Sequence, residues 1–421
     1  MRDFALLIML LTLAGLVWRT PWLGVLALAF IGYMHPQGYA EGFLQGARLF
    51  AACFLLTVVA FVVKQREPWG QWLRDRLGLF RDWRLLAMIA LWAWAAVTSY
   101  MALIPADAWR HWVEFTKVFA TVGLTLLLID DRRKLEALLL IIALAIGLVA
   151  VKGGYWALIH GAQDRVYGSP AGHFHDNNHF AVANLMAVPL LLYFWSATEG
   201  RAVRWLLGIV VAFGLIAVLS SWSRGGLLGL GATLLALAIT SRRRGAVLTL
   251  LAGMAVAAVV LMPESWLERM QTITTPTEEA SARGRLEFWR FGLELGAKRP
   301  LWGWGFGSDI PLTERAEWHS SYVQMFAEQG APGSLLWLGL LGGTFFLLGR
   351  SILGRRRTAQ ADPQKAALSR ALMASFVAYG VCGVFLGISY WDIFFHLIGV
   401  SVLVDRLPIG PGDTTRDWQR G

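Results

Sequence analysis

Long apolar runs recur along almost the whole chain, and they limit its possible folds more than any other feature. The chain has 421 residues, and stretches such as 135–160 and 332–349 carry few or no charges. A run of about 18 such residues is long enough to cross a bilayer as a helix. Backbone amides and carbonyls must be paired inside lipid, so spans of this kind fold as helices. The sequence therefore predicts an all-α, polytopic integral membrane protein with about twelve transmembrane helices.

The composition agrees with a membrane protein. Hydrophobic residues make up 56% of the chain and charged residues 16%, where a soluble domain carries roughly 25% charged residues. The 21 tryptophans fit as well, because indole rings favour the headgroup level of a bilayer. The formal charge of +10 comes from basic residues between apolar runs. That placement is typical of cytoplasmic loops, so we expect no nucleic-acid partner.

The charge pattern also predicts the topology. Basic loops stay in the cytoplasm, which places the arginines at 242–244 inside. Alternating from there leaves both termini inside if residues 4–34 form one pass, broken at Arg19-Thr20-Pro21. No small-residue cleavage site follows the first apolar run, so we expect it to be retained. Cys53 and Cys382 lie in apolar segments and are predicted to be buried thiols without a disulfide.

The expected organisation has four parts. Residues 1–262 would hold the first nine transmembrane helices with short outer loops, and residues 263–331 a large periplasmic loop with amphipathic helices. Residues 332–404 would form the C-terminal transmembrane helices and 405–421 a cytoplasmic tail. Residues 69–80 alternate charge with aromatic or leucine residues at helical spacing, and we expect them to lie flat at the inner interface.

Polar residues gather on three connections that face outward in this topology. These are residues 151–180, residues 220–226 (SSWSRGG) and the long loop 263–331. Basic groups on separate connections of one bundle indicate a shared anionic site. The apolar spans beneath it would suit a lipid tail.

The long loop contains a predicted helix from about 275 to 299. Glu278 and Glu279 lie in an early turn, where carboxylates favour a helix start. Leu286, Trp289 and Leu293 mark an apolar face at helical spacing. We expect this face to rest on the membrane.

Two arginines of this helix differ in their expected partners. Arg283 can pair with Glu287 four residues on, a purely structural role. Arg285 has Trp289 at that position. A guanidinium offers two parallel donors to a phosphate and stays charged at any biological pH. Arg285 is therefore a candidate anion ligand, and a solvated side chain is the alternative.

The segment WHSSYVQMFAEQGAPG predicts a second helix, from His319 to Gly330. Glycine supplies a helix end, and Pro332 opens the next span. At a helix N-terminus the dipole disfavours an imidazolium, so His319 is a candidate general base. Tyr322 shares a face with His319. The alternative for His319 is an interfacial histidine with a satisfied hydrogen bond.

The segment HFHDNNH invites a metal hypothesis, with His173, His175, Asp176 and His179 close together. The spacing is loose and lacks the HExxH or CxxC patterns of zinc sites, so we expect no metal.

Four further side chains of the outer connections are candidates for contact with a substrate. Asn177 and Asn178 can donate to a glycan or a phosphate, or can end a loop. Lys152, near the outer end of its span, either serves a site or extends to the interface. Arg224 lies in SWSRGG between two spans, where an interfacial anchor is the alternative role.

Together, several motifs resemble the O-antigen ligase/polymerase superfamily of bacterial envelope proteins. RGRLEFWRFGLELGAKRPLWGWGFGS is similar to its arginine motif and the following "RPLxGxGFG" stretch. HSSYVQMFAEQGAPG, with His319, Gly330 and Gly333, resembles its histidine motif, and SWSRGG its "SRG" element. The N-terminal part is also similar to the exosortase-associated O-glycosylation ligases.

The resemblance implies a GT-C-like helical fold and a glycosyltransferase in the bacterial inner membrane with its active site facing the periplasm. Such proteins transfer a glycan from undecaprenyl diphosphate to an acceptor hydroxyl, with inversion, without a metal or other cofactor. By the resemblance, His319 would activate the hydroxyl, Arg285 and Arg224 would bind the diphosphate, and Lys152 and Arg165 would assist.

Three acceptors remain open: lipid A-core, which we favour, a protein serine or threonine, and a growing glycan as in an O-antigen polymerase. From other classes we consider a transporter and a membrane scaffold. A transporter would favour charges at midspan and paired halves, which the sequence lacks. A scaffold would leave the basic outer loops unexplained.

Overall fold

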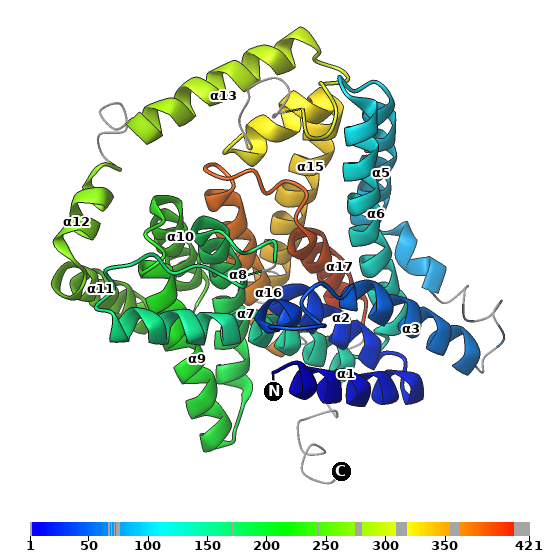
Figure 1. The fold of residues 1–421 in the computed structure, drawn as a ribbon, viewed down its shortest axis with the longest axis horizontal. Helices are drawn as coiled ribbons and strands as arrows, with labels where there is room; N and C mark the ends of the chain where they lie inside the picture. Colours follow the sequence, from blue (N-terminus) through cyan, green and yellow to red (C-terminus); the bar gives the residue numbers. More distant parts are fainter. Residues whose placement is uncertain are drawn as a thin grey trace.

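The computed structural model describes residues 2–65, 68, 70, 72, 76–170, 172–241, 244–273, 280–308, 318–353 and 363–407. These residues form helices and turns, with no strand among them (Figure 1). The helices are α1 (Arg2–Arg19), α2 (Leu23–Met34), α3 (Leu49–Lys64), α5 (Trp83–Tyr100), α6 (Pro105–Leu128), α7 (Arg132–Ile159), α8 (Asn177–Ala197), α9 (Arg201–Leu219), α10 (Arg224–Thr240), α11 (Arg244–Leu261), α12 (Glu264–Gln271), α13 (Ala280–Lys298), α15 (Ser321–Leu353), α16 (Pro363–Cys382) and α17 (Asp392–Arg406), with short 3-10 helices η1 (Pro36–Tyr39) and η2 (Gly78–Arg81).

Within the described residues, five helices are long and apolar enough to cross a membrane: α7, α8, α9, α11 and α15. Helices α2, α3 and α10 are apolar but shorter. The all-α expectation and the membrane character are therefore supported, while the count of about twelve crossings stays a prediction. The break predicted at Arg19-Thr20-Pro21 is present, because α1 ends at Arg19 and α2 begins at Leu23.

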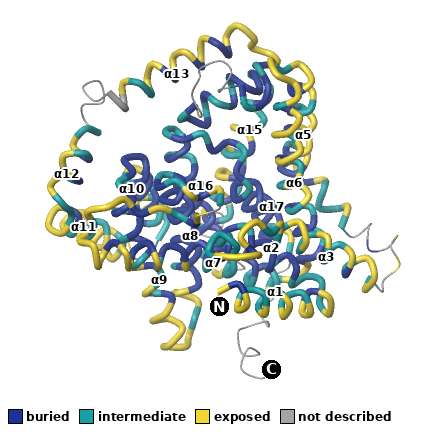
Figure 2. Tube along the Cα trace, viewed as in Figure 1, coloured by how far each residue is buried: buried dark blue, intermediate teal, exposed yellow. Residues whose placement is uncertain are grey.

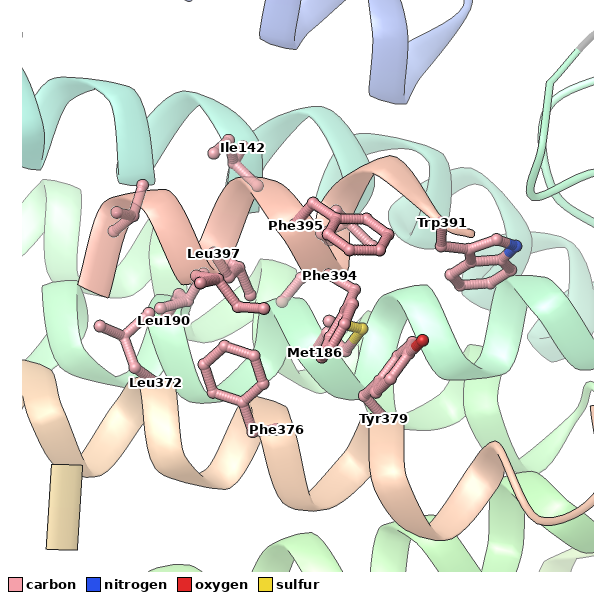
Figure 3. Close-up of a cluster of buried hydrophobic side chains, with 14 of the residues drawn as sticks. Ile142, Met186, Leu190, Leu372, Phe376, Tyr379, Trp391, Phe394, Phe395 and Leu397 are labelled. Carbon is pink, nitrogen blue, oxygen red and sulfur yellow. The ribbon is translucent and has the colours of Figure 1, made fainter. Parts of the chain in front are cut away.

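Helices α8, α16 and α17 form the centre of the bundle. In α8, 78% of the most apolar window is buried, compared with 6% in α11, so α11 lies at the periphery (Figure 2). Figure 3 shows side chains of α8 (Met186, Leu190), α16 (Phe376, Tyr379) and α17 (Phe394, Leu397) meeting in this core. The rings of Tyr379 and Phe394 stack with centroids 4.4 Å apart. In lipid such contacts act through packing and hydrogen bonds, because lipid tails are as apolar as the side chains.

A buried ion-pair cluster joins α17 to the start of α5, at the end of α17 far from Asp392. Arg84 is 1% exposed. It donates to Asp82 Oδ2 and to Asp405 Oδ2, both at 2.9 Å, and to Ser401 Oγ at 3.1 Å. A buried charge is stable only when paired in this way.

Helix α13 arches over one end of the bundle from α12 to α15 (Figure 1). The helix predicted in this part of the long loop is confirmed, and Glu278 and Glu279 lie outside the described residues. Its buried face is carried by Phe288 and Leu295, with Gly292 between them, and Leu286 and Leu293 are exposed. Phe288 and Leu295 share a cluster with Trp318. Contact of the exposed leucines with the membrane stays a prediction.

The expected helix from His319 to Gly330 begins two residues later, at Ser321. Its end is as predicted, because Gly330 interrupts the helical dihedrals with a φ of +66°. The loop before it explains this break. Ala331 N–H donates to the Pro300 carbonyl at 2.7 Å, and a Cβ on Gly330 would lie 2.4 Å from Leu301 O. A side chain at 330 would meet both strain and a clash.

Two predicted features lie largely or wholly outside the described residues. Most of the segment expected to lie flat at 69–80 is outside the described residues, and its described end forms η2. The arginines at 242 and 243 are also outside them.

Candidate active site

Two of the three expected outer connections are joined directly. The α7–α8 connection lies alongside the turn between α9 and α10. Val166 N–H donates to the Ser220 carbonyl at 2.9 Å, and Asn177 Nδ2 donates to the Ser221 carbonyl at 2.6 Å. Trp222 Nε1 donates back to the Ala162 carbonyl at 3.2 Å. These bonds fix the segment that carries Arg224 against the segment that carries Arg165.

Helix α12, the first element of the long loop, attaches to the same turn. Trp266 Nε1 donates to the Leu219 carbonyl at 2.9 Å. Arg269 Nε donates to the Trp222 carbonyl at 3.1 Å, and Arg224 Nη1 donates to Thr272 Oγ1 at 2.7 Å. The three connections that the sequence predicted to face outward therefore meet here.

Four arginines from four segments gather at this junction. The charges of Arg269 and Arg285 both act on Arg224, and those of Arg165 and Arg285 act on Arg269. Burial, and then the neighbouring charges of Arg165 and Arg285, lowers the pKa of the Arg269 guanidinium. Arginine still remains protonated at biological pH. Such a concentration of like charge favours a polyanion such as a diphosphate.

Trp222, at the centre of this junction, has a strained backbone conformation. Its φ is +58°, in the left-handed region that non-glycine residues rarely adopt. Both its indole and its carbonyl are engaged, with Ala162 and Arg269. Strain of this kind persists only where the surroundings impose it, and it concentrates at functional sites.

His319 lies just before α15 and is linked to the arginines by aromatic packing. Trp289 of α13, one helical turn after Arg285, donates from Nε1 to the His319 carbonyl at 3.1 Å. The Trp289 ring lies 6.1 Å from that of Phe385. Gly225, next to Arg224, packs on Phe385 so closely that a Cβ would come within 3.3 Å.

The backbone of His319 is also in the left-handed region, with a φ of +51°. The residues on either side of it are fixed. Trp318 Nε1 donates to Glu328 Oε1 at 3.0 Å, and Ser321 N–H donates to the Gly383 carbonyl at 2.7 Å. The backbone around His319 is thus held on both sides.

The segment 383–388 after α16 supports these residues and carried no signal in the sequence. Ser321 Oγ donates to the Leu386 carbonyl at 2.8 Å and accepts from Ile388 N–H at 3.0 Å. Cys382 Sγ donates to the Gly225 carbonyl at 3.4 Å. Arg269 and Glu328 were also missed. Their charges could be read from the sequence, but not their burial or their neighbours.

Beside the arginines lies a groove of about 890 Å³. Lys152, Arg165 and Trp222 line it, together with tyrosines of η1 and α7 and with Trp156. Lys152 Nζ lies 4.5 Å from the centre of the Tyr39 ring, and both Lys152 and Arg165 are exposed. The structure therefore places Lys152 and Arg165 on one groove that borders the arginine cluster.

The remaining candidates have local structural partners. Asn177 is buried with its amide on Ser221, and Asn178 Nδ2 donates to Asp176 Oδ1 at 3.0 Å. Tyr322 donates from its hydroxyl to the Gly380 carbonyl at 2.9 Å. These bonds show structural roles, and contact with substrate by the three side chains stays a prediction.

Asp176 is the N-cap of α8. It accepts the N–H groups of Asn178 at 2.8 Å and His179 at 3.3 Å. Burial would raise the pKa of Asp176, but bonds from His179 and Asn178 lower it overall. Across the described part of the chain, no group of three or more histidine, cysteine or acidic side chains is arranged to hold a metal ion.

Comparison with known families assigns two regions of the chain. Residues 207–338 match the family described as O-antigen ligase. The chain carries an O-antigen ligase domain. The resemblance to the O-antigen ligase/polymerase superfamily is thereby confirmed, and the domain supports a ligase- or polymerase-type enzyme that transfers glycans.

The O-antigen ligase domain holds Arg224, Arg269, Arg285, His319 and Tyr322. Residues 1–199 match a family of unknown function (DUF5935). Lys152, Arg165 and the asparagine pair lie in this part of the chain, so both regions contribute to the site. No curated protein matches the chain. Similarity to the exosortase-associated ligases stays a prediction.

Proposed function

We propose that this protein transfers a glycan from undecaprenyl diphosphate to an acceptor hydroxyl at the periplasmic face of the inner membrane. The observation that carries the proposal is the meeting of Arg165, Arg224, Arg269 and Arg285 beside a groove. Arginine binds phosphates through charge-assisted, often paired hydrogen bonds. Four guanidiniums can balance the charge of a diphosphate and stabilise it as a leaving group.

The reaction follows from the two kinds of side chain. The acceptor oxygen attacks the anomeric carbon and forms the new glycosidic bond. The bond from that carbon to the diphosphate oxygen breaks, and lipid diphosphate leaves with the electron pair. The imidazole of His319 takes the proton of the acceptor hydroxyl. Attack opposite the leaving group inverts the anomeric carbon.

We favour lipid A-core as the acceptor, which would make the product a complete lipopolysaccharide. A protein hydroxyl or a growing glycan would use the same donor site and the same base. Lys152, Asn177, Asn178 and Tyr322 are proposed to contact the glycan or the diphosphate at the edge of the site.

The test is reconstitution in vesicles with undecaprenyl-diphosphate glycan and lipid A-core. Wild type is compared with Arg285→Gln and with Arg290→Gln, five residues further along α13. Arg290 is exposed and pairs with Glu294 at 3.0 Å, so it is a matched control. We expect glycan-capped core from wild type and Arg290→Gln and almost none from Arg285→Gln.

Equal transfer by the two variants would overturn the diphosphate site. Separate reactions with an acceptor polypeptide and an acceptor glycan identify the acceptor. If the donor is consumed only with the polypeptide or only with the glycan, the proposed donor site stands and that molecule is the acceptor instead of lipid A-core.

A further inference from the structure

A second cavity shares no lining residue with the groove beside the arginine cluster. Its volume is about 850 Å³, within the usual range for a small-molecule site. Helices α2, α3 and α6 form most of it, and His173, Asp392 and His396 complete it. None of its lining residues belongs to the O-antigen ligase domain at 207–338.

One wall of the cavity is apolar. Leu28 of α2, Phe50 and Phe54 of α3, and Val118 and Val122 of α6 line it. Helix α3 is one of the apolar helices, and its Leu55, Val59, Val62 and Val63 are exposed. An apolar wall between such helices suits a hydrocarbon chain.

Charged side chains border the same cavity. Arg48, at the start of α3, is exposed and has no carboxylate partner among the described residues. Lys117 Nζ lies 2.6 Å from Glu114 Oε1 on α6, and both also line the cavity. Arg48 and Lys117 thus line one cavity, and Arg48, which has no carboxylate partner in the described part of the chain, can bind a phosphate.

The cavity also offers hydrogen-bonding atoms without partners. His35 Nε2 and Gln37 Oε1 are buried, and within the described chain neither has a hydrogen bond. Both residues line the cavity. A buried polar atom without a partner costs free energy, so a bound group that pairs with both atoms would stabilise this arrangement.

We propose that this cavity binds a phosphodiester lipid of the glycerophospholipid class. One acyl chain lies on the apolar wall, and the phosphate contacts Arg48 and Lys117. A headgroup hydroxyl accepts from His35 Nε2 and donates to Gln37 Oε1. The proposal does not depend on the proposed transfer reaction, because the site shares no residue with the arginine cluster.

The test is native mass spectrometry of the purified protein in detergent. The probes are a short-chain phosphatidylglycerol, the matching diacylglycerol, which has no phosphate, and inorganic phosphate. Ala51→Trp fills the cavity from α3, because Ala51 lines it and is exposed. Ala52→Trp is the control, since Ala52 is equally exposed but does not line the cavity. Ala120→Trp fills the cavity from α6 and replaces Ala51→Trp if that variant does not fold.

We expect wild type, Ala52→Trp and Arg285→Gln to retain one phosphatidylglycerol, and the cavity-filling variant to bind it at least about tenfold more weakly. Arg48→Gln should weaken binding of phosphatidylglycerol but not of diacylglycerol. Equal binding by wild type and both filling variants would overturn the site. Diacylglycerol held as tightly as phosphatidylglycerol, or phosphatidylglycerol displaced by inorganic phosphate alone, would overturn the recognition of a phosphodiester lipid.

Discussion

The indole of Trp318 donates a hydrogen bond to Glu328 Oε1 at 3.0 Å, and this pair holds the residue that precedes His319. Glu328 is 1% exposed, and its Oε2 accepts from the Tyr390 hydroxyl at 2.8 Å. Its backbone is enclosed by the glycine-rich loop, where a Cβ on Gly303 would lie 2.5 Å from Glu328 O. The proposed base thus follows directly on a residue that is held by a buried carboxylate.

Glu328→Gln should lower both stability and activity. A glutamine keeps the shape but replaces one acceptor oxygen by a donor, so one of the donors Trp318 and Tyr390 loses its acceptor. A buried polar group left unpaired costs about 1–3 kcal/mol. We expect a lower melting temperature in detergent and a smaller kcat with little change in KM for the donor. Trp318→Phe should reproduce the fall in kcat, and a normal kcat in both variants would show that the pair does not position His319.

Arg269→Gln should weaken donor use although the sequence did not single out this residue. A hydrogen bond to a charged group contributes about 1.5–3 kcal/mol, which corresponds to at least about tenfold in kcat/KM. The measurement is the rate of transfer at several salt concentrations. Salt screens exposed charges, so KM for the donor should rise with ionic strength in wild type and rise less in Arg269→Gln. Arg290→Gln should behave as wild type, and an unchanged salt dependence in Arg269→Gln would contradict the role of this arginine.

His319→Ala should remove transfer while donor binding is retained. The proton of the acceptor has no other proposed base, whereas the diphosphate is held by the arginines. A neutral imidazole is needed, so the wild-type rate should fall as acidification protonates it. Donor binding and single-turnover rates across pH test this together. A variant that retains the wild-type pH profile would exclude His319 as the base.

Asp176→Ala should destabilise the start of α8. Loss of an N-cap typically costs about 1 kcal/mol. The pKa of Asp176 lies below its usual range, because hydrogen bonds to its carboxylate outweigh its burial. Its contribution is therefore fully present at neutral pH and is lost only as the pH falls below about 3.9, the ordinary aspartate value. Asp176→Asn keeps a cap and should lose less at pH 7 in thermal unfolding. Equal losses of stability in the two variants would show that the negative charge of Asp176, and not its capping hydrogen bonds, stabilises the start of α8.

Arg84→Ala should strongly destabilise the fold at the C-terminal end of α17, where Arg84 bonds to Ser401 and Asp405. It leaves Asp82 without its paired cation and, among the described residues, Asp405 with only Lys365, 3.6 Å away. Removing one partner of a buried ion pair typically costs about 3–5 kcal/mol. Arg110→Ala is the contrast, because Arg110 and Asp107 are exposed and such pairs contribute about 0–1 kcal/mol. Thermal unfolding of both variants in the same detergent gives the comparison, and similar melting temperatures would contradict the role of the buried cluster.

The sequence by itself determined the elements and several of their ends. Apolar length required helices, Pro21 separates α1 from α2, and Gly330 interrupts α15, because these effects act within a few residues. Arg224, Arg285 and His319 were also recognisable from local motifs.

Only the tertiary structure decided which side chains meet. Arg269 joins Arg224 because α12 folds back onto Trp222, and Glu328 places His319 because a loop encloses its backbone. The asparagine pair instead supports the backbone, with Asn177 on Ser221. Burial, charge repulsion and hydrogen-bond partners of this kind arise between segments far apart in the chain, so no local pattern carries them.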